Sequence, residues 1–199
     1  EYRKHLKNKN ILINETIDYN LIQEEEHKIL YKNIVSKHIV FAEGYGLKNN
    51  PFFNTLPLEG SKGELVTIKA PKLKLNFVLK SSVFIIPLGN DIYRVGSTYH
   101  KNDKTNAITV QAKEELLNKL KAFIICDFEV IDQMAGIRPT VKDRKPLVGL
   151  HKTYNNMSVL NGLGTRGVMI GPYVAKQLFN HIENSTPLDN EINIARFDD

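Results

Sequence analysis

A glycine-rich segment near the end of the chain constrains its fold more than any other feature. Residues 162–167 read Gly-Leu-Gly-Thr-Arg-Gly, a G-x-G-x-x-G pattern that follows a strand-like run at 157–160 and opens an apolar, helix-like stretch ending at Ile182. A complete dinucleotide-binding unit also needs a second strand that ends in an acidic residue about 20 positions after the glycines. That window, 183–187, is dominated by turn-forming residues instead. We therefore expect a backbone that approaches a ligand closely at a helix N-terminus, but not a dinucleotide site formed by this unit alone.

Composition and residue spacing exclude several functional classes. With 42% hydrophobic and 25% charged residues among 199, the chain is typical of globular proteins and long enough for one large or two small domains. No apolar run approaches the roughly 20 residues of a membrane span. The single Cys126 cannot form an internal disulfide and favours a reducing compartment, so we expect a cytoplasmic protein. The histidines and the cysteine lack the spacing of a metal site, and we expect no bound metal.

The net charge of +5 is spread along the whole chain. Lysines stand at helix and loop positions throughout, which is typical of a solvated basic surface. We expect no nucleic-acid partner on this ground, although the charge leaves one open as an alternative.

The first 50 residues end in a pattern typical of a buried parallel strand. Largely β-branched apolar residues fill 34–35 and 39–42, and the sequence Gly-Tyr-Gly follows at 44–46. A short apolar run bounded by glycine favours a parallel strand whose loop lies at the carboxyl edge of the sheet. This edge is where open α/β sheets bind their ligands.

After Pro51 the pattern changes to that of an antiparallel meander. Strand-like runs, several with period-two alternation, occur at 65–68, 75–79, 83–86, 92–97 and 128–131. Residues 109–124 predict an amphipathic helix, because Leu116, Leu120 and Ile124 fall on one face.

Together these patterns predict a mixed fold, α/β plus α+β, in two domains. Residues 1–50 and 134–199 form a partial, Rossmann-like domain with a parallel sheet. Residues 51–133 interrupt it and form a mostly antiparallel sheet that carries the helix on one face.

Five short motifs follow one another along most of the chain. They lie at 39–44, at 56–64, at 84–87 with 93–98, at 135–149 and at 162–172. Each is weak alone, but in this order they resemble the C-terminal half of the FAD-dependent oxidoreductases of the D-amino-acid oxidase/glycine oxidase family. The fourth motif, Ala-Gly-Ile-Arg-Pro followed by Asp143, Pro146 and Gly149, is similar to that family's Ala-Gly-x-Arg-Pro-x-x-x-Asp-x-x-Pro-x-x-Gly.

The resemblance implies that part of the family's FAD-binding domain belongs upstream of residue 1. Glu1 is not an initiator Met, and no signal-peptide core follows it. We therefore expect the chain to be the C-terminal part of a longer protein, with the missing N-terminal segment as its partner, and it stays open whether the chain alone holds FAD. Glu43 also departs from the family, which prefers Ala there, and residues 164–166 differ from those of glycine oxidases.

The resemblance also implies which residues contact FAD. The glycine-rich segment is similar to a loop that approaches the pyrimidine edge of the flavin, where a helix N-terminus would stabilise the negative charge of the reduced ring. The expected cofactor-binding residues are Ala42, Gly44, Gly162, Leu163, Gly164, Thr165, Gly167 and Val168.

Four residues are expected at the substrate. Arg138 corresponds to the arginine that binds the substrate carboxylate in similar glycine oxidases, a role suited to a planar, bidentate guanidinium. Arg166 would add a second positive charge, and Phe84 and Tyr99 would face the substrate above the flavin. We expect no catalytic side chain, because hydride passes directly to the flavin in this family, and His100 is expected to be a loop residue.

The expected function is therefore the FAD-dependent oxidation of the C–N bond of a small amine or amino acid. Three alternatives stay open. The same motifs are similar to the flavin domain of bifunctional enzymes that modify the wobble uridine of tRNA, which would make tRNA a partner. The scaffold also serves 2-hydroxy-acid dehydrogenases. Finally, the chain could be a non-catalytic fragment that does not retain FAD.

Overall fold

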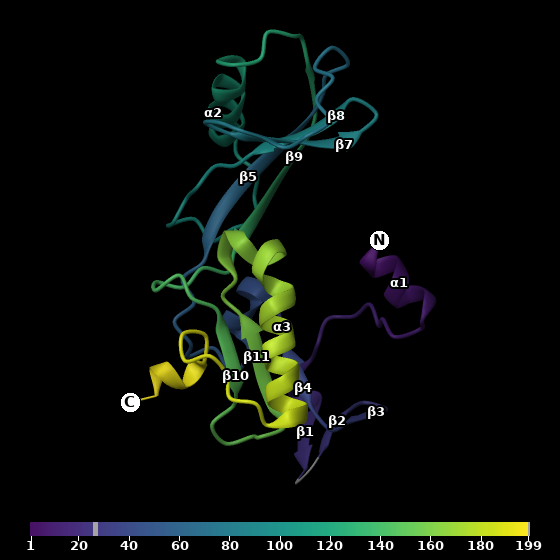
Figure 1. The fold of residues 1–199 in the computed structure, drawn as a ribbon, viewed down its shortest axis with the longest axis vertical. Helices are drawn as coiled ribbons and strands as arrows, with labels where there is room; N and C mark the ends of the chain where they lie inside the picture. Colours follow the sequence, from purple (N-terminus) through teal and green to yellow (C-terminus); the bar gives the residue numbers. More distant parts are fainter. Residues whose placement is uncertain (26–27, 199) are drawn as a thin grey trace.

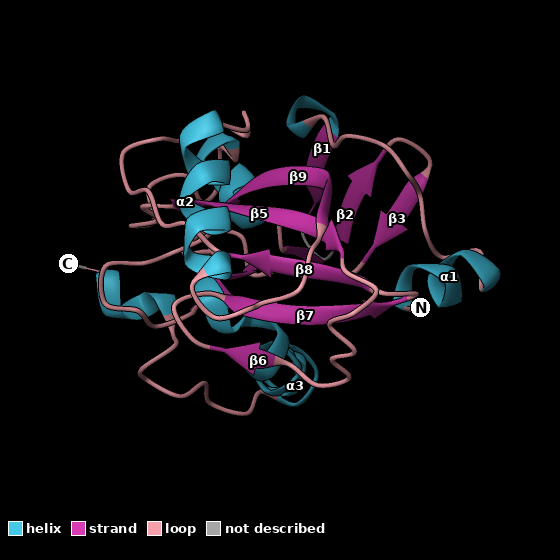
Figure 2. Cartoon of the chain, turned by 90° about the horizontal axis from the view of Figure 1, so that it is seen from above, coloured by secondary structure: helices cyan, strands magenta, loops and turns pink. Residues whose placement is uncertain are grey.

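Five antiparallel strands from the middle of the chain form the largest sheet of the computed structural model, which describes residues 1–25 and 28–198. Their order in the sheet is β6 (Leu79–Lys80), β7 (Phe84–Gly89), β8 (Ile92–Gly96), β5 (Ser61–Lys69) and β9 (Glu129–Arg138). Figure 2 looks onto this sheet and shows these strands side by side. Strand β9 includes residues on both sides of the boundary that we predicted between residues 133 and 134. The large sheet continues to Arg138.

The helix α2 (Val110–Lys121) covers one face of this sheet (Figure 1). Thr109 is its N-cap, and the hydroxyl oxygen accepts a hydrogen bond from the backbone N–H of Ala112 at 3.2 Å. Leu116 and Leu120, one turn apart, are fully buried against strand residues. The core beneath the helix consists of Val66, Ile68, Ala70, Val83, Ile85, Tyr93 and Val95.

The other end of the molecule contains a smaller, mixed sheet (Figure 1). Its order is β10 (Leu147–Leu150), β11 (Met157–Asn161) and β4 (Ile39–Phe41); β11 pairs antiparallel with β10 and parallel with β4. The long helix α3 (Gly167–Asn184) packs on this sheet through Val174 and Leu178, which contact Val148. The mixed α/β fold class predicted from the sequence is therefore confirmed.

The parallel strand expected over residues 34–42 is shorter than predicted. Ser36 Oγ donates to the His38 carbonyl at 2.7 Å and accepts from the His38 N–H at 3.3 Å, which turns the chain between two strands. Only β4 joins the mixed sheet. β3 (Ile34–Ser36) instead belongs to a separate antiparallel sheet with the strand order β1 (Ile22–Glu25), β2 (Lys28–Tyr31) and β3.

The remaining described elements are short. They are the helix α1 (Tyr2–Asn8) and the 3-10 helices at Tyr19–Leu21, Gly44–Asn49, Gly164–Arg166 and Ile194–Phe197. Among the described residues no helix has both the length and the apolar character needed to cross a membrane.

The strands β5 and β9 connect the two ends of the molecule (Figure 1). They pair over their whole length, and the register brings Ser61, the first residue of β5, opposite Arg138, the last residue of β9. The chain therefore enters and leaves the large sheet at one place, beside the mixed sheet.

Candidate functional site

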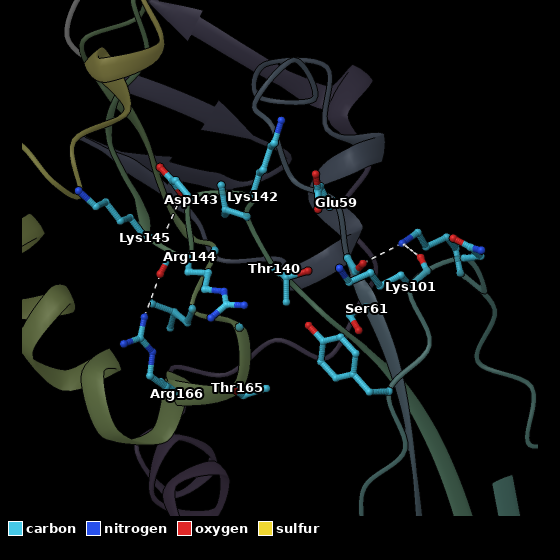
Figure 3. A pocket seen from close by; sticks show the side chains of 18 of the residues that line it. Glu59, Ser61, Lys101, Thr140, Lys142, Asp143, Arg144, Lys145, Thr165 and Arg166 are labelled. Atoms are coloured by element: carbon cyan, nitrogen blue, oxygen red, sulfur yellow. Dashed lines mark hydrogen bonds between the residues drawn. The ribbon is translucent and has the colours of Figure 1, made fainter.

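A cleft of ≈ 1060 Å³ opens at this junction. It lies between the start of β5 and three loops, which are drawn in Figure 3. We call these the crossing loop (residues 97–109), the basic turn (residues 140–145) and the glycine loop (residues 162–167). The residues around the cleft therefore come from both ends of the molecule.

The glycine loop connects β11 to α3 and needs its first two glycines for different reasons. Gly162 has φ +70°, and a Cβ there would lie 2.8 Å from Val141 Cγ2 and 3.0 Å from the Leu147 backbone nitrogen. Gly164 has φ +55°, but its nearest neighbour would be Thr140 Cγ2 at 3.7 Å. Packing thus requires glycine at 162, whereas backbone conformation alone favours it at 164, where the backbone is open to a ligand.

The glycine loop ends at the start of α3. No acidic side chain lies in the first turn of this 18-residue helix, and its N-cap, Arg166, makes no capping hydrogen bond with its side chain. The positive end of the helix dipole is therefore available to an electronegative group.

The structure places the expected cofactor residues in three groups. Gly162, Leu163, Gly164 and Thr165 line the cleft. Gly167 and Val168 begin α3 outside the lining, and the Val168 side chain is fully exposed.

Ala42 and Gly44 also lie outside the cleft lining, in the segment that follows β4. The Gly44 carbonyl accepts a hydrogen bond from Asn161 Nδ2 at 2.9 Å, and Asn161 Oδ1 accepts from the Gly162 N–H at 2.8 Å. The buried Asn161 therefore ties the segment after β4 to the glycine loop.

The carboxylate of Glu43 is held within the protein. It accepts hydrogen bonds from the Tyr19 hydroxyl and from Asn50 Nδ2, the latter at 2.8 Å. Burial and the neighbouring Glu43 raise the pKa of Tyr19 to about 12. The departure from the family's alanine is therefore accommodated by two internal donors.

Arg138 lies across Gly63, on the neighbouring strand. Its Nη2 donates to Ser97 Oγ at 2.7 Å and to the Thr98 carbonyl at 3.3 Å, while the Tyr99 ring centroid is 5.4 Å from Cζ. Burial lowers the pKa of the guanidinium, which nevertheless stays charged. No described acidic side chain lies within ion-pair distance of it.

Arg138 is not itself a lining residue, but it contacts two residues that are: the Tyr99 ring lies beside its guanidinium, and the Ser61 carbonyl accepts from Nη1 at 3.5 Å. Phe84 is not a lining residue either, but it shares a sheet face with Arg138. The register pairs Phe84 with Gly96, Gly96 with Leu65, and Ser61 with Arg138, and residues 61, 63 and 65 point to one side of β5.

Arg166 lines the cleft and binds the basic turn. Its Nη2 donates to the Arg144 carbonyl at 2.9 Å, so the two guanidinium groups come from adjoining loops (Figure 3). Among the described residues no hydrogen bond joins Arg166 to Arg138, so the two arginines are held by different neighbours.

Sequence reasoning missed most of the charged residues that line the cleft. These are Glu59, Lys101, Lys104, Lys142, Asp143, Arg144, Lys145 and Glu191. Within the described residues Asp143 pairs with Arg196 at 3.0 Å and Lys145 with Glu191 at 3.3 Å, whereas Lys101, Lys142 and Arg144 have no acidic partner within 4.0 Å. The run of charged residues at 142–145 was the sequence signal that could have identified part of this set. Positively charged side chains outnumber negatively charged ones around the cleft, which favours an anionic ligand.

Comparison with protein families gives a match over most of the chain. The family model described as DAO, FAD dependent oxidoreductase, matches residues 17–180. A tRNA 5-methylaminomethyl-2-thiouridine biosynthesis bifunctional protein MnmC from Legionella pneumophila (strain Lens) is 26% identical over 140 residues, covering 68% of this chain and 20% of the relative. Glycine oxidase from Bacillus subtilis (strain 168) is 24% identical over 173 residues, covering 83% of this chain and 46% of the relative.

Solved structures show the same fold. Glycine oxidase from Bacillus cereus ATCC 14579 superposes with a TM-score of 0.68 at 19% identity, covering 83% of this chain and 48% of that one. Iminodiacetate oxidase from Chelativorans sp. BNC1 superposes with a TM-score of 0.70 at 18% identity, covering 86% and 51%. The chain thus spans about half the length, or less, of the proteins it matches.

Proposed function

The chain belongs to the DAO family of FAD-dependent oxidoreductases, and we propose that it forms the substrate-facing part of an enzyme that oxidises the C–N bond of an amine or amino acid. The observation that carries this proposal is Arg138, a partly buried guanidinium beside the cleft with no described acidic partner. A substrate carboxylate would supply the missing charge, in a bidentate geometry that arginine favours.

The glycine loop fits one part of FAD. Gly162, Leu163, Gly164 and Thr165 present backbone to the cleft beside the uncapped start of α3, which suits the electronegative edge of the flavin ring. FAD, when bound, supplies the acceptor for the two electrons and the hydrogen that leave the substrate. The chain's own task is to hold the substrate carbon against that acceptor and to exclude water from the cleft.

Arg138 and Tyr99 would anchor the substrate from the sheet side. Tyr99 covers the guanidinium and lines the cleft, so a carboxylate that reaches Arg138 passes next to the tyrosine ring. The arginine would then exchange its contacts with Ser97 and Thr98, at 2.7 and 3.3 Å, for charge-assisted bonds to the substrate.

His100 does not serve as a general base in this proposal. Its side chain is exposed and absent from the cleft lining, and its backbone N–H and carbonyl pair with Lys62, both at 2.9 Å. This placement supports direct hydride transfer without an essential side-chain base.

The remainder of the FAD site would come from another segment of the same protein. Strand β4 lies at the end of the mixed sheet's strand order, so one of its edges has no described partner strand in that sheet. Nearby, α3 carries exposed Val168, Met169, Tyr173 and Phe179. A dinucleotide-binding unit that added a strand to β4 and packed on α3 would cover these apolar side chains.

A wobble-uridine-modifying function is the second candidate, and the charge of the cleft favours it. Lys101, Lys142 and Arg144 line the cleft without a described acidic partner, and such groups attract nucleic-acid phosphates. MnmC proteins, named for the biosynthesis of 5-methylaminomethyl-2-thiouridine in tRNA, are among the relatives at 26% identity.

The purified full-length protein tests these proposals. We expect it to carry flavin absorbance bands, and to oxidise small amino acids or secondary amines in preference to 2-hydroxy acids. Turnover of tRNA bearing a carboxymethylaminomethyl uridine, with none of free amino acids, would establish the second candidate instead. A colourless protein that takes up no added FAD would contradict both and leave a non-catalytic module.

A further inference from the structure

A lysine is completely buried in strand β5. The Lys62 side chain has no exposed surface, and its Nζ lies 2.6 Å from Asp103 Oδ2 and 3.6 Å from Glu64 Oε1. Removing an ammonium group from water is unfavourable, and a buried ion pair often stabilises a fold less than apolar residues of the same volume. The presence of Lys62 is therefore better explained by what its charge holds in place.

What Lys62 holds is the middle of the crossing loop. Asp103 belongs to this loop and pairs with the ammonium group directly. The backbone of Lys62 also pairs with that of His100, through two hydrogen bonds of 2.9 Å. Lys62 thus fixes the crossing loop by side chain and main chain together.

Glu64, on the same face of β5, holds the far end of the crossing loop. Its Oε2 accepts from the Thr109 N–H at 2.8 Å and from Gln133 Nε2 at 2.9 Å, and its Oε1 accepts from the Thr109 hydroxyl at 2.9 Å. Because Thr109 is also the N-cap of α2, the loop is fixed where the helix begins. Lys62 is the positive group of this buried network.

The crossing loop carries residues to the cleft from the side opposite the glycine loop. Tyr99, Lys101, Asn102 and Lys104 line the cleft, and Tyr99 covers Arg138. Lys104 Nζ also donates to the Gly60 carbonyl at 2.7 Å, which brings the loop against the start of β5. The position of the loop therefore decides what surrounds a substrate carboxylate.

We infer that Lys62 is a positioning residue for the substrate site. Through Asp103 its buried ammonium group holds the crossing loop so that Tyr99 and Lys101 face the cleft. Lys62 makes no contact with the cleft itself, so it affects the substrate only through the loop. The expected kinetic effect rests on the function proposed above, whereas the effect on the loop does not.

Proteolysis tests the loop directly. The variants are Lys62→Met and Asp103→Asn, which remove one charge each, and Asp103→Glu, which keeps it. Lys74→Met is the matched control, because it breaks the 3.0 Å pair of Lys74 with Asp91 in the same part of the molecule but away from the cleft. We expect trypsin to cleave the folded Lys62→Met and Asp103→Asn proteins after Lys101 and Lys104 about tenfold faster than the wild type, because local opening sets the rate. Asp103→Glu and Lys74→Met should stay near the wild-type rate.

Steady-state kinetics of the flavin-loaded protein then separates positioning from general structure. For Lys62→Met and Asp103→Asn we expect KM for the amine or amino acid to rise about tenfold while kcat stays within about twofold, with unchanged flavin content. Cleavage rates and KM values equal to those of Lys74→Met would overturn the inference.

Two further outcomes have a definite meaning. If Lys62→Met does not fold, Asp103→Asn decides, because the Asp103 side chain is 37% exposed and tolerates the change. If the wild type oxidises neither amines nor amino acids, the proposed function fails, and the cleavage rates alone support or overturn the positioning role of Lys62.

Discussion

Arg138 occupies the space that a side chain at position 63 would need. Gly63 lies on β5 next to the end of β9, and an added Cβ would overlap the Arg138 guanidinium. Gly136 is directly opposite Gly63 in the strand register, yet a Cβ there would meet no atom within 4 Å. The two paired glycines therefore differ in what they make room for.

Gly63→Ala is expected to displace the guanidinium and lower kcat/KM for carboxylate substrates by about tenfold or more, since a misplaced charge-assisted contact has this order of effect. Gly136→Ala is the matched control and should leave kcat/KM unchanged. Initial rates with an amino acid, with flavin content measured in parallel, check both variants. Equal activity of the two variants would show that the position of Arg138 is not important for substrate binding.

Arg138→Lys tests the carboxylate anchor itself. Lysine keeps the charge but cannot make two parallel hydrogen bonds to a carboxylate, so kcat/KM should fall by roughly tenfold to several hundredfold, the equivalent of about 1.5–3 kcal/mol. Amines without a carboxylate should be affected little, and the flavin spectrum should stay the same. An equal loss on both substrate types would assign Arg138 a structural role and leave Arg166 as the next candidate for the anchor.

Gly164→Val tests the glycine loop. The left-handed backbone at 164 disfavours a branched side chain by about 1–2 kcal/mol, and the new side chain would extend into the open cleft. We expect flavin content to fall sharply. Gly89→Val is the control for backbone strain, because Gly89 has φ +92° and open space in a hairpin far from the cleft. If Gly164→Val retained full flavin, the loop would not be the contact proposed.

His38 makes stability depend on pH. Its Nε2 lies 3.0 Å from Ser158 Oγ, between β4 and β11, and burial lowers the pKa of His38 despite the opposing effect of Glu183. The unfolded chain, with a histidine pKa of about 6.5, therefore takes up the proton more readily than the folded one. His38 therefore contributes fully to the free energy of unfolding above pH ~6.5, and this contribution is lost as the pH falls below ~6.5.

The expected result is a smaller acid sensitivity of His38→Gln than of the wild type. Urea unfolding on either side of pH ~6.5 measures the free energy of unfolding in both proteins. Part of the sensitivity should remain, because burial also lowers the pKa of His151. An unchanged loss of stability on acidification would show that His38 does not couple folding to protonation. His5→Gln, at an exposed position, serves as the control.

The elements that were predicted well depend on local chemistry. Thr109 caps α2, and the leucines at 116 and 120 are buried, as helical periodicity predicts. The split between β3 and β4 was missed because it depends on hydrogen bonds between Ser36 and His38, which apolar patterning does not register.

The cleft was predicted less completely, because its residues meet only through the fold. Residues 162–165 were found from their glycines, whereas Lys101 and Arg144 lie on loops that are far apart in the sequence. Lys62 is the extreme case. Alternation along β5 puts position 62 on the same buried face as Val66 and Ile68, where a lysine is not expected, and the approach of Asp103 and Glu64 explains how its charge is accommodated there.

The pairing of Ser61 with Arg138 also bears on how the residues around the cleft can vary between relatives. Everything between these residues starts and ends on adjacent strands, so the large sheet, α2 and the crossing loop form a single excursion of the chain. The corresponding segment of a relative could therefore replace residues 61–138 through two chain connections that lie on adjacent strands. The path of the glycine loop would stay unchanged. Evolution can therefore vary one wall of the cleft while the opposite wall is inherited intact.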